Sequence, residues 1–245
     1  MKMSGLNSER ATRHGLARVI SKLGVMSRSE AARWVMGGRV RVNDLVILDP
    51  EFPVREGIDQ VVIQGIEAAR AARQVLMLNK PRGLVTSTRD ERGRDTVYRC
   101  FDGTDLPWVA PVGRLDKASE GLLLFANDPE WAARITAPGT GPDKTYHVQV
   151  ATVPTPALIA AVAEGAVVDG DRLTVKSVRL LRAGGKNGWL EIVLDEGRNR
   201  HIRRLLEAFE IRVLRLVRTA IGPLMLGDLG KGQWRPLTDD EVASL

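Results

Sequence analysis

The segment VGRLDKASEGLLLF, Val112 to Phe125, constrains the fold most strongly, because it joins a charged cluster directly to an apolar run. The four large apolar residues at 122–125 predict a buried strand or core segment. An ionised group beside a dry interior must be paired or neutralised. Arg114 and Asp116 therefore mark either a solvated turn that precedes a strand or a carboxylate held there for chemistry.

Composition narrows the class of protein. The chain has 245 residues, of which 44% are hydrophobic and 27% charged, the balance of an ordinary globular protein. Its apolar runs are too short to span a bilayer, and no secretory signal begins it. A single cysteine suits a reducing compartment, so we expect a cytoplasmic protein. Three histidines far apart in the chain give no metal-site spacing, and we expect neither metal nor cofactor.

The net charge of +6 is concentrated in two blocks. Residues 1–41 carry nine lysines and arginines against two glutamates, and residues 198–218 carry seven arginines against two glutamates. A basic block can be a solubilising face, but on a folded segment it is also typical of a polyanion partner. Two separate blocks favour nucleic acid.

Hydrophobic periodicity divides the chain into parts. Residues 1–14 are polar and aperiodic, which predicts a disordered tail. Residues 15–63 read as two short helices and a hairpin, and the small-residue stretch at 64–74 reads as a linker. Residues 75–245 mix strands and helices without strict alternation, which predicts an α+β domain with a mixed, largely antiparallel sheet. Within it, residues 196–209 predict a basic helix whose apolar stripe is Ile202, Leu205, Leu206 and Phe209.

Five segments of the larger part occur in the order typical of one enzyme family: LNKPRG, VGRLDKASEGLLLF, KTYHVQV, EGRNRHIRRLLEAF and IGPLML…GQWRPLTDDEV. In these segments the chain resembles RNA pseudouridine synthases of the ribosomal small-subunit and large-subunit type. The N-terminal unit, RVISKLGVMSRSEAARWVMGGRVRVND, resembles the S4 RNA-binding domain that these enzymes often carry. The resemblance covers nearly the whole chain from about Gly15.

The resemblance assigns Asp116 as the catalytic aspartate of uridine isomerisation. That reaction breaks the C1′–N1 glycosidic bond, rotates the uracil and rejoins it through C5, without a cofactor. A carboxylate can act as a nucleophile at the sugar or as a base at C2′, and the sequence leaves both routes open. For a lone aspartate near Arg114, a turn or ion-pair role would be the simpler interpretation.

The resemblance also implies roles for other residues. Tyr146 would stack on the flipped uracil, although its strand pattern alone would suggest core packing. Arg203 would pair with Asp116. Five further residues are expected to bind substrate: Arg114, Arg198, Arg200, Arg204 and Lys80. Two departures lie beside the site: His201 stands where the family has glutamine, and Leu205 where methionine is common.

The expected function is isomerisation of a specific uridine in ribosomal RNA, with 23S favoured over 16S, by a monomeric protein. One alternative is a tRNA pseudouridine synthase, and another is a non-catalytic RNA-binding factor of ribosome assembly. Glu120, four residues after Asp116, raises a third alternative, the carboxylate pair of a glycoside hydrolase. The 4% aromatic content argues against that alternative, because sugar polymers usually require many aromatic platforms.

Overall fold

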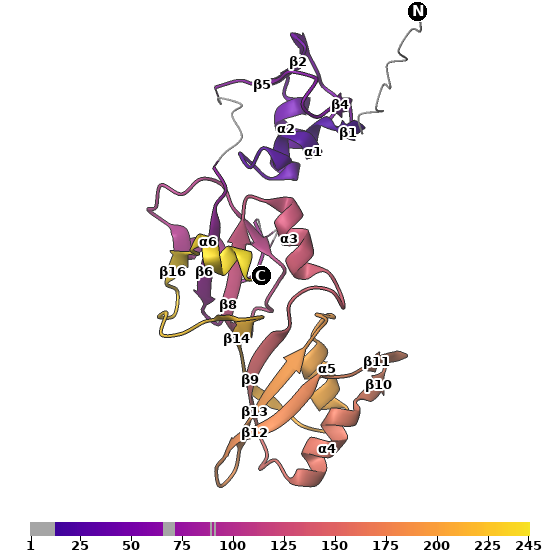
Figure 1. The fold of residues 1–245 in the computed structure, drawn as a ribbon, viewed down its shortest axis with the longest axis vertical. Coiled ribbons are helices and arrows are strands. Elements are labelled where there is room, and N and C mark those ends of the chain that lie inside the picture. Colours follow the sequence, from indigo (N-terminus) through magenta and orange to yellow (C-terminus); the bar gives the residue numbers. More distant parts are fainter. Residues whose placement is uncertain (1–12, 66–71, 89, 91) are drawn as a thin grey trace, which may run out of the picture. The chain divides into compact units, whose positions relative to one another are not determined.

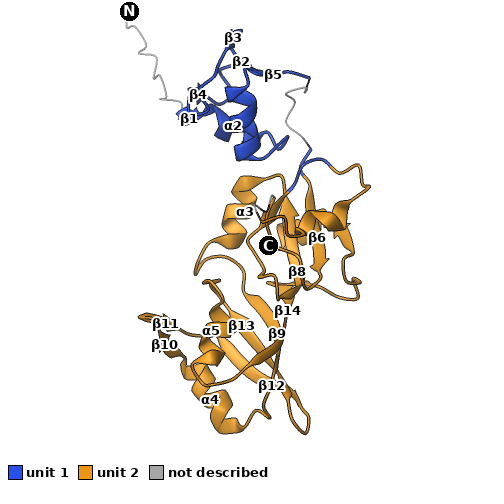
Figure 2. Cartoon of the chain, turned by 180° about the vertical axis from the view of Figure 1, so that it is seen from behind, with its two compact units in different colours: residues 1–73, 107–109 blue, residues 74–106, 110–245 orange. Residues whose placement is uncertain are grey.

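A computed structural model describes residues 13–65, 72–88, 90 and 92–245. The chain divides into two compact units, one of residues 1–73 with 107–109 and one of residues 74–106 with 110–245 (Figure 2). Most of the predicted linker, at residues 66–71, lies outside the described residues, as do residues 1–12 of the predicted tail.

The smaller unit consists of two short helices and two small sheets (Figure 1). Its elements are β1 (Arg13–Gly15), α1 (Leu16–Lys22), α2 (Arg28–Met36), β2 (Val40–Val42), β3 (Leu45–Val46), β4 (Pro53–Arg55) and β5 (Val61–Ile63). Strand β1 pairs with β4, and β2 lies between β3 and β5, all antiparallel. The predicted tail is wrong at Arg13 and His14, because both pair with β4.

Local sequence signals account for these short elements. Leu16 and Ile20 of α1 are fully buried, as their spacing predicts. The hydroxyl of Ser27 accepts a hydrogen bond from the backbone N–H of Glu30 and so caps α2. Asn43 and Asp44 both have positive φ, at 47° and 67°, which suits the tight turn between β2 and β3. Apolar side chains from both helices and from strands β2, β4 and β5 form one core.

The larger unit contains the remaining elements (Figure 1). They are β6 (Val75–Lys80), η1 (Val97–Phe101), β7 (Ala110–Val112), β8 (Glu120–Ala126), α3 (Pro129–Thr136), β9 (Lys144–Val150), α4 (Pro156–Glu164), β10 (Ala166–Val168), β11 (Asp171–Leu173), β12 (Ser177–Ala183), β13 (Gly188–Leu194), α5 (His201–Glu207), β14 (Val213–Ile221), β15 (Leu224–Met225), β16 (Trp234–Pro236) and α6 (Asp239–Ala243).

One sheet of nine strands organises the larger unit, in the order β12-β13-β9-β14-β8-β6-β16, with β15 on β14 and β7 on β8. Among the described strands of this sheet, only β8 and β14 pair in parallel; the others pair antiparallel. The predicted α+β fold with a mixed, largely antiparallel sheet is therefore confirmed. Strand β8 is buried along its whole length, as the apolar run at 122–125 predicted.

Gly121 allows the start of β8 to lie against β14. Its φ is +100°, and a Cβ built on it would lie 2.2 Å from the carbonyl oxygen of Arg218. Such an approach is open only to glycine. It brings the end of the charged turn that carries Asp116 next to strand β14.

Helix α5 is shorter than the basic helix predicted for residues 196–209. It begins at His201, and its N-cap Arg200 has a left-handed backbone with φ 49°. Ile202, Leu205 and Leu206 are buried, as the predicted stripe requires. The left-handed residue breaks the helical path, so 196–200 is a loop that leads into α5.

Candidate active site

A cavity of about 270 Å³ in the larger unit brings together residues from four separate parts of the sequence. It lies between the turn that follows β7, strands β9 and β14, and the loop that leads into α5. Six predicted site residues line it: Arg114, Asp116, Tyr146, Arg198, Arg200 and Arg203. The other two, Lys80 and Arg204, are not among the residues that line it.

Asp116 lies in the turn between β7 and β8, and its side chain is partly exposed. Its carbonyl oxygen accepts a hydrogen bond from the backbone N–H of Ser119 at 2.9 Å, which closes the turn. The carboxylate lines the cavity, while the apolar run of β8 begins four residues later. The turn thus presents the Asp116 carboxylate to the cavity, and strand β8 connects the turn to the core.

Lys80 holds this turn from the side of β6. Its side chain is fully buried, and its ammonium donates to the carbonyl oxygens of Asp116 at 3.3 Å, Ser119 at 2.9 Å and Pro81 at 3.0 Å. Burial lowers the pKa of Lys80 to about 8, because desolvation disfavours the charged form. In this structure the Lys80 ammonium is buried among three backbone carbonyls and does not line the cavity, so its predicted substrate contact stays a prediction.

Arg203 holds the same turn from helix α5. Its Nη2 donates to the carbonyl oxygen of Ala118 at 3.2 Å, and its Nε is buried without a hydrogen-bond partner among the described residues. Burial lowers the pKa of Arg203, the charge of Arg200 lowers it further, and the charge of Asp116 opposes both. The charges of Arg203 and Asp116 interact, but no ion pair within 4.0 Å joins their side chains in the described structure, so the predicted pairing stays a prediction.

Tyr146 occupies the inner face of strand β9. It is 8% exposed and lies opposite Arg218 of β14 and Ile192 of β13 in the strand register. The strand alternates buried and partly exposed residues along its length, so the aromatic ring faces the same side as Val148. Tyr146 lines the cavity as well as the core, so packing and substrate contact are compatible at this position.

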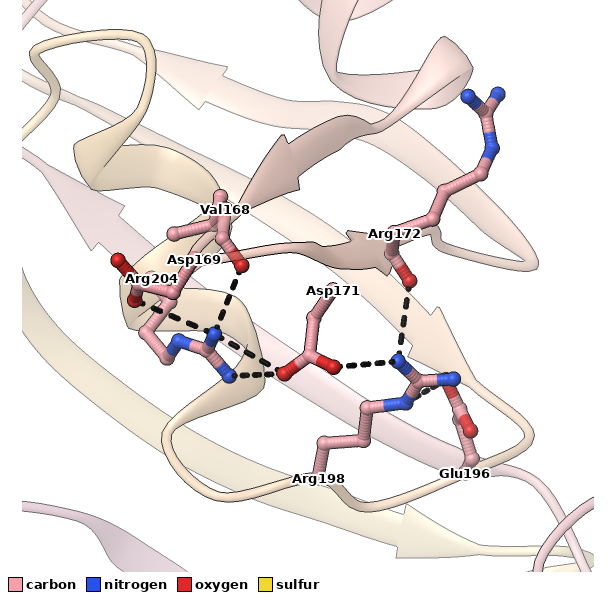
Figure 3. A network of polar contacts seen from close by, with 7 residues as sticks. All are labelled: Val168, Asp169, Asp171, Arg172, Glu196, Arg198 and Arg204. Atoms are coloured by element: carbon pink, nitrogen blue, oxygen red, sulfur yellow. Dashed lines mark hydrogen bonds and ion pairs between the residues drawn. The ribbon is translucent and has the colours of Figure 1, made fainter.

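Arg204 belongs to a structural network instead of the cavity, as Figure 3 shows. Its Nη2 lies 3.2 Å from a carboxylate oxygen of Asp171 and 3.4 Å from one of Asp169, and it donates to the carbonyl of Val168 at 3.1 Å. These contacts fasten α5 to the hairpin of β10 and β11. Arg204 does not line the cavity and is paired with the hairpin carboxylates, so its predicted substrate contact stays a prediction.

Arg198 takes part in the same network from the loop before α5 (Figure 3). Its Nε lies 2.9 Å from a carboxylate oxygen of Glu196, and its Nη1 lies 3.7 Å from Asp171. The side chain also lines the cavity. Arg198 is therefore available to substrate only in competition with two carboxylates.

Arg114 and Arg200 are, like Arg198, exposed cations at the cavity, and we call these two the rim arginines. Neither forms an ion pair with a carboxylate in the part of the chain that the structure describes. An unpaired guanidinium at the entrance of a cavity is suited to a phosphate oxygen.

Two buried cations and a buried histidine that line the cavity were not predicted as site residues: Lys144, Arg218 and His201. Lys144 shares a strand face with Tyr146, and Arg218 shares one with the buried Leu216 and Ala220 on β14. The period-two pattern of these strands was the signal that could have identified both cations. Burial lowers the pKa of His201, whose two ring nitrogens are buried without a hydrogen-bond partner among the described residues.

Glu120 does not face Asp116 across the cavity. It is 4% exposed and accepts hydrogen bonds from Arg215 at 3.0 and 3.1 Å, and Lys231 lies 2.8 Å away. Burial raises the pKa of Glu120, but the hydrogen bonds from the two cations together lower it below its usual range. The carboxylate is a structural ion-pair partner, which removes the basis for a glycoside hydrolase.

No group of histidine, cysteine and carboxylate side chains suited to a metal ion occurs within the described residues. Over the same residues, no helix is both long and apolar enough to cross a bilayer.

The fold and cavity define the class of protein. A carboxylate beside a half-buried arginine and a tyrosine, in a small cavity with exposed arginines at its entrance, is the arrangement of an enzyme site for an anionic substrate. The particular family follows from comparison with known proteins.

Residues 74–208 match the family model of the RNA pseudouridylate synthases, and residues 15–59 match that of the S4 domain. The chain is 35% identical over 223 residues to an uncharacterized RNA pseudouridine synthase of Rickettsia bellii, which covers 91% of this chain and 96% of the relative. It is 33% identical over 233 residues to ribosomal large subunit pseudouridine synthase B of Bacillus subtilis, with 94% of each covered. A crystal structure of a pseudouridylate synthase superposes with a TM-score of 0.66 at 29% identity, covering 95% of this chain and 99% of that one. This chain belongs to the RNA pseudouridine synthase family.

Proposed function

We propose that this pseudouridine synthase isomerises a specific uridine of ribosomal RNA, with Asp116 as the catalytic carboxylate. The observation that carries the proposal is the cavity in which Asp116, Tyr146 and Arg203 meet although they are far apart in the sequence. Family membership supplies the reaction, and the cavity supplies residues of the chemical types that the reaction needs.

The chemistry of each residue supports its role. Asp116 acts on the ribose, either as nucleophile at C1′ or as base at C2′. Arg203 holds the turn that carries Asp116 through the carbonyl oxygen of Ala118, and its positive charge lies near that carboxylate. The ring of Tyr146 is a platform for an extruded base, and its hydroxyl can assist removal of the C5 proton. The rim arginines and Arg198 contact phosphates of the RNA.

The relatives support ribosomal RNA as the substrate class. The Bacillus subtilis relative, which aligns with nearly the whole chain, is named for the large ribosomal subunit. We therefore place the target in 23S rRNA in preference to 16S. The S4 match at residues 15–59 supports a division into an RNA-binding unit at 15–63, a linker at 64–74 and a catalytic domain at 75–245. Such a substrate implies a cytoplasmic protein, and a monomeric state stays a prediction.

Two alternatives give different outcomes in one experiment. A tRNA synthase would modify tRNA and leave rRNA unchanged. A non-catalytic assembly factor would bind rRNA without converting uridine, but such a factor would have no need to combine a cavity carboxylate with Tyr146 and Arg203. The purified chain should be incubated separately with unmodified 23S rRNA, 16S rRNA and bulk tRNA, and pseudouridine mapped at nucleotide resolution.

The variant Asp116→Asn provides the matched control, because the amide keeps the size and shape of the carboxylate. We expect one site in 23S rRNA for the native chain and none for the variant, with RNA affinity unchanged. Conversion by Asp116→Asn at the native rate would show that another residue carries the chemistry. Conversion only in tRNA, or binding without conversion, would establish one of the alternatives.

A further inference from the structure

Two buried cations line the active-site cavity and have no carboxylate partner in the described part of the chain. Arg218 is 5% exposed and Lys144 is 9% exposed. We call them the inner cations, because the rim arginines at the same cavity are exposed.

The contacts of the inner cations leave donors unused. Nε of Arg218 donates to the carbonyl oxygen of Leu122 at 2.7 Å, but its Nη2 is buried and has no hydrogen-bond partner among the described residues. No hydrogen bond or ion pair joins the Lys144 ammonium to another of those residues. Burial and the charge of Arg218 lower the pKa of Lys144, and the more weakly acting charges of Asp143 and Asp195 oppose them. Burying like charges without partners is costly. Such an arrangement indicates that a ligand supplies the missing acceptor.

The position of the inner cations in the cavity indicates which part of a bound nucleotide they contact. A nucleotide extruded from its helix enters a pocket with the base first, and its phosphates stay with the RNA backbone outside. Arg218 lies opposite Tyr146 in the strand register, and Lys144 is on the same face of β9 as Tyr146. The inner cations therefore lie at the level of the uracil, and the rim arginines at the level of the phosphates.

The reaction creates negative charge on that uracil. When the C1′–N1 bond breaks, its electron pair remains with the base and spreads from N1 onto O2 and O4. This holds whether Asp116 captures C1′ or removes a proton at C2′. The base then rejoins through C5, and the C5 proton is lost while N1 gains one, so substrate and product have the same atoms and electrons.

We propose that Lys144 and Arg218 bind the carbonyl oxygens of the extruded uracil and stabilise the negative charge that the base carries while it is detached from the ribose. They are catalytic residues of this isomerisation in addition to Asp116, Tyr146 and Arg203. Fixed cations in a dry site stabilise developing charge more strongly than water does. The proposal rests on the proposed function of the cavity.

The test separates binding from chemistry. Single-turnover rates at saturating RNA and equilibrium affinities should be measured for Lys144→Gln and Arg218→Gln on an RNA fragment that contains the mapped uridine. We expect each rate to fall by about 100-fold or more, as for the loss of one donor to a developing anion, while affinity stays within about threefold. The conservative variants Lys144→Arg and Arg218→Lys, which keep the charge, should recover part of the rate.

Matched variants guard against a purely structural effect. Arg215 lies on β14 three residues before Arg218, but it pairs with Glu120 and does not line the cavity. Arg215→Gln should lower stability and keep the native single-turnover rate. Lys144→Gln removes a charge without removing a hydrogen bond, so it remains informative even if Arg218→Gln does not fold.

A second RNA distinguishes the uracil from a phosphate. Neutral methylphosphonates at the two phosphates flanking the target should weaken binding equally in the native chain and in both inner-cation variants. The inference is overturned if the inner-cation variants are insensitive to the methylphosphonates, or if they keep the native rate. A native chain that converts no RNA would instead contradict the proposed function.

Discussion

The ammonium nitrogen of Lys80 lies 3.3 Å from the carbonyl oxygen of Asp116, at the end of a side chain with no solvent exposure. Because the same ammonium donates to Ser119, the last residue of strand β6 fastens the turn that carries the proposed catalytic carboxylate. Arg203 fastens the turn from helix α5 through the carbonyl of Ala118. The position of Asp116 therefore depends on two cations that bind backbone oxygens.

Replacing Lys80 with methionine should loosen this turn. The change keeps the apolar stem but leaves buried carbonyl oxygens without a donor, so we expect the free energy of unfolding to fall by about 2–4 kcal/mol. The single-turnover rate should fall with it, whereas RNA affinity should not change, because the Lys80 ammonium is buried against backbone carbonyls. Lys117→Met, on the exposed side of the same turn, is the control and should be nearly neutral. If Lys80→Met binds RNA more weakly but keeps the native rate, the substrate contact that the sequence suggested for Lys80 would be supported instead.

Lys80 should also make stability depend on pH. Burial lowers its pKa from 10.5 to about 8, against the smaller opposing effects of Cys100, Asp116 and Glu120. Between about pH 8 and pH 10.5 the unfolded chain holds a proton that the folded chain has released, so stability rises with pH by up to about 1.4 kcal/mol per unit. That contribution is lost as the pH falls through about 8. Denaturant unfolding at several pH values in this window should show a shallower slope for Lys80→Met; equal slopes would contradict the assigned pKa.

Tyr146→Phe should keep the aromatic platform and lose only the hydroxyl. Because the ring supplies the packing on β9, we expect native stability and RNA affinity together with a sharp fall in product formation. Rapid-quench measurements on saturating RNA decide between the two roles. Equal turnover by both proteins would reduce Tyr146 to a packing residue.

Arg200 is the N-cap of α5, and Arg204 lies four residues later in the same helix. Substitution of each by glutamine should affect RNA affinity and stability in opposite ways. Arg200 is exposed at the cavity without an ion pair in the described structure, so its loss should weaken RNA binding and make the salt dependence of binding less steep. Arg204 is paired with Asp169 and Asp171, so its loss should leave affinity unchanged and lower stability by about 1 kcal/mol. Binding titrations at two salt concentrations, with thermal unfolding of each variant, test both expectations. An equal loss of affinity in the two variants would place Arg204 on the RNA path.

Deleting residues 1–70 should weaken RNA binding and leave the rate of the isomerisation step nearly unchanged. The larger unit has its own core, built on β6, β8, α3 and β14, so we expect the fragment to fold. Its apparent KM should rise much more than its turnover at saturating RNA falls, as when uniform binding is removed. Its salt dependence should be less steep, because fewer phosphates are neutralised. A fragment with native affinity and native salt dependence would show that the N-terminal arginines do not touch this RNA.

The sequence alone determined those features that depend on neighbours in the chain. Asp128 predicted the start of α3, and its carboxylate does accept from the backbone of Glu130 and Trp131. The alternation of KTYHVQV predicted the inner face of β9, and the five ordered motifs predicted the family. These signals are local, because caps, turns and strand faces depend on residues two to four positions apart.

Only the tertiary structure decided the roles of the cations. Lys80 meets the carbonyl of Asp116 across 36 positions of sequence, and Arg218 meets that of Leu122 across 96. A basic residue in a motif looks the same whether it faces solvent, a carboxylate or a buried carbonyl. Its charge is directed by whichever partner the fold brings within hydrogen-bonding distance, and that partner is set by the pairing of strands and helices far apart in the chain.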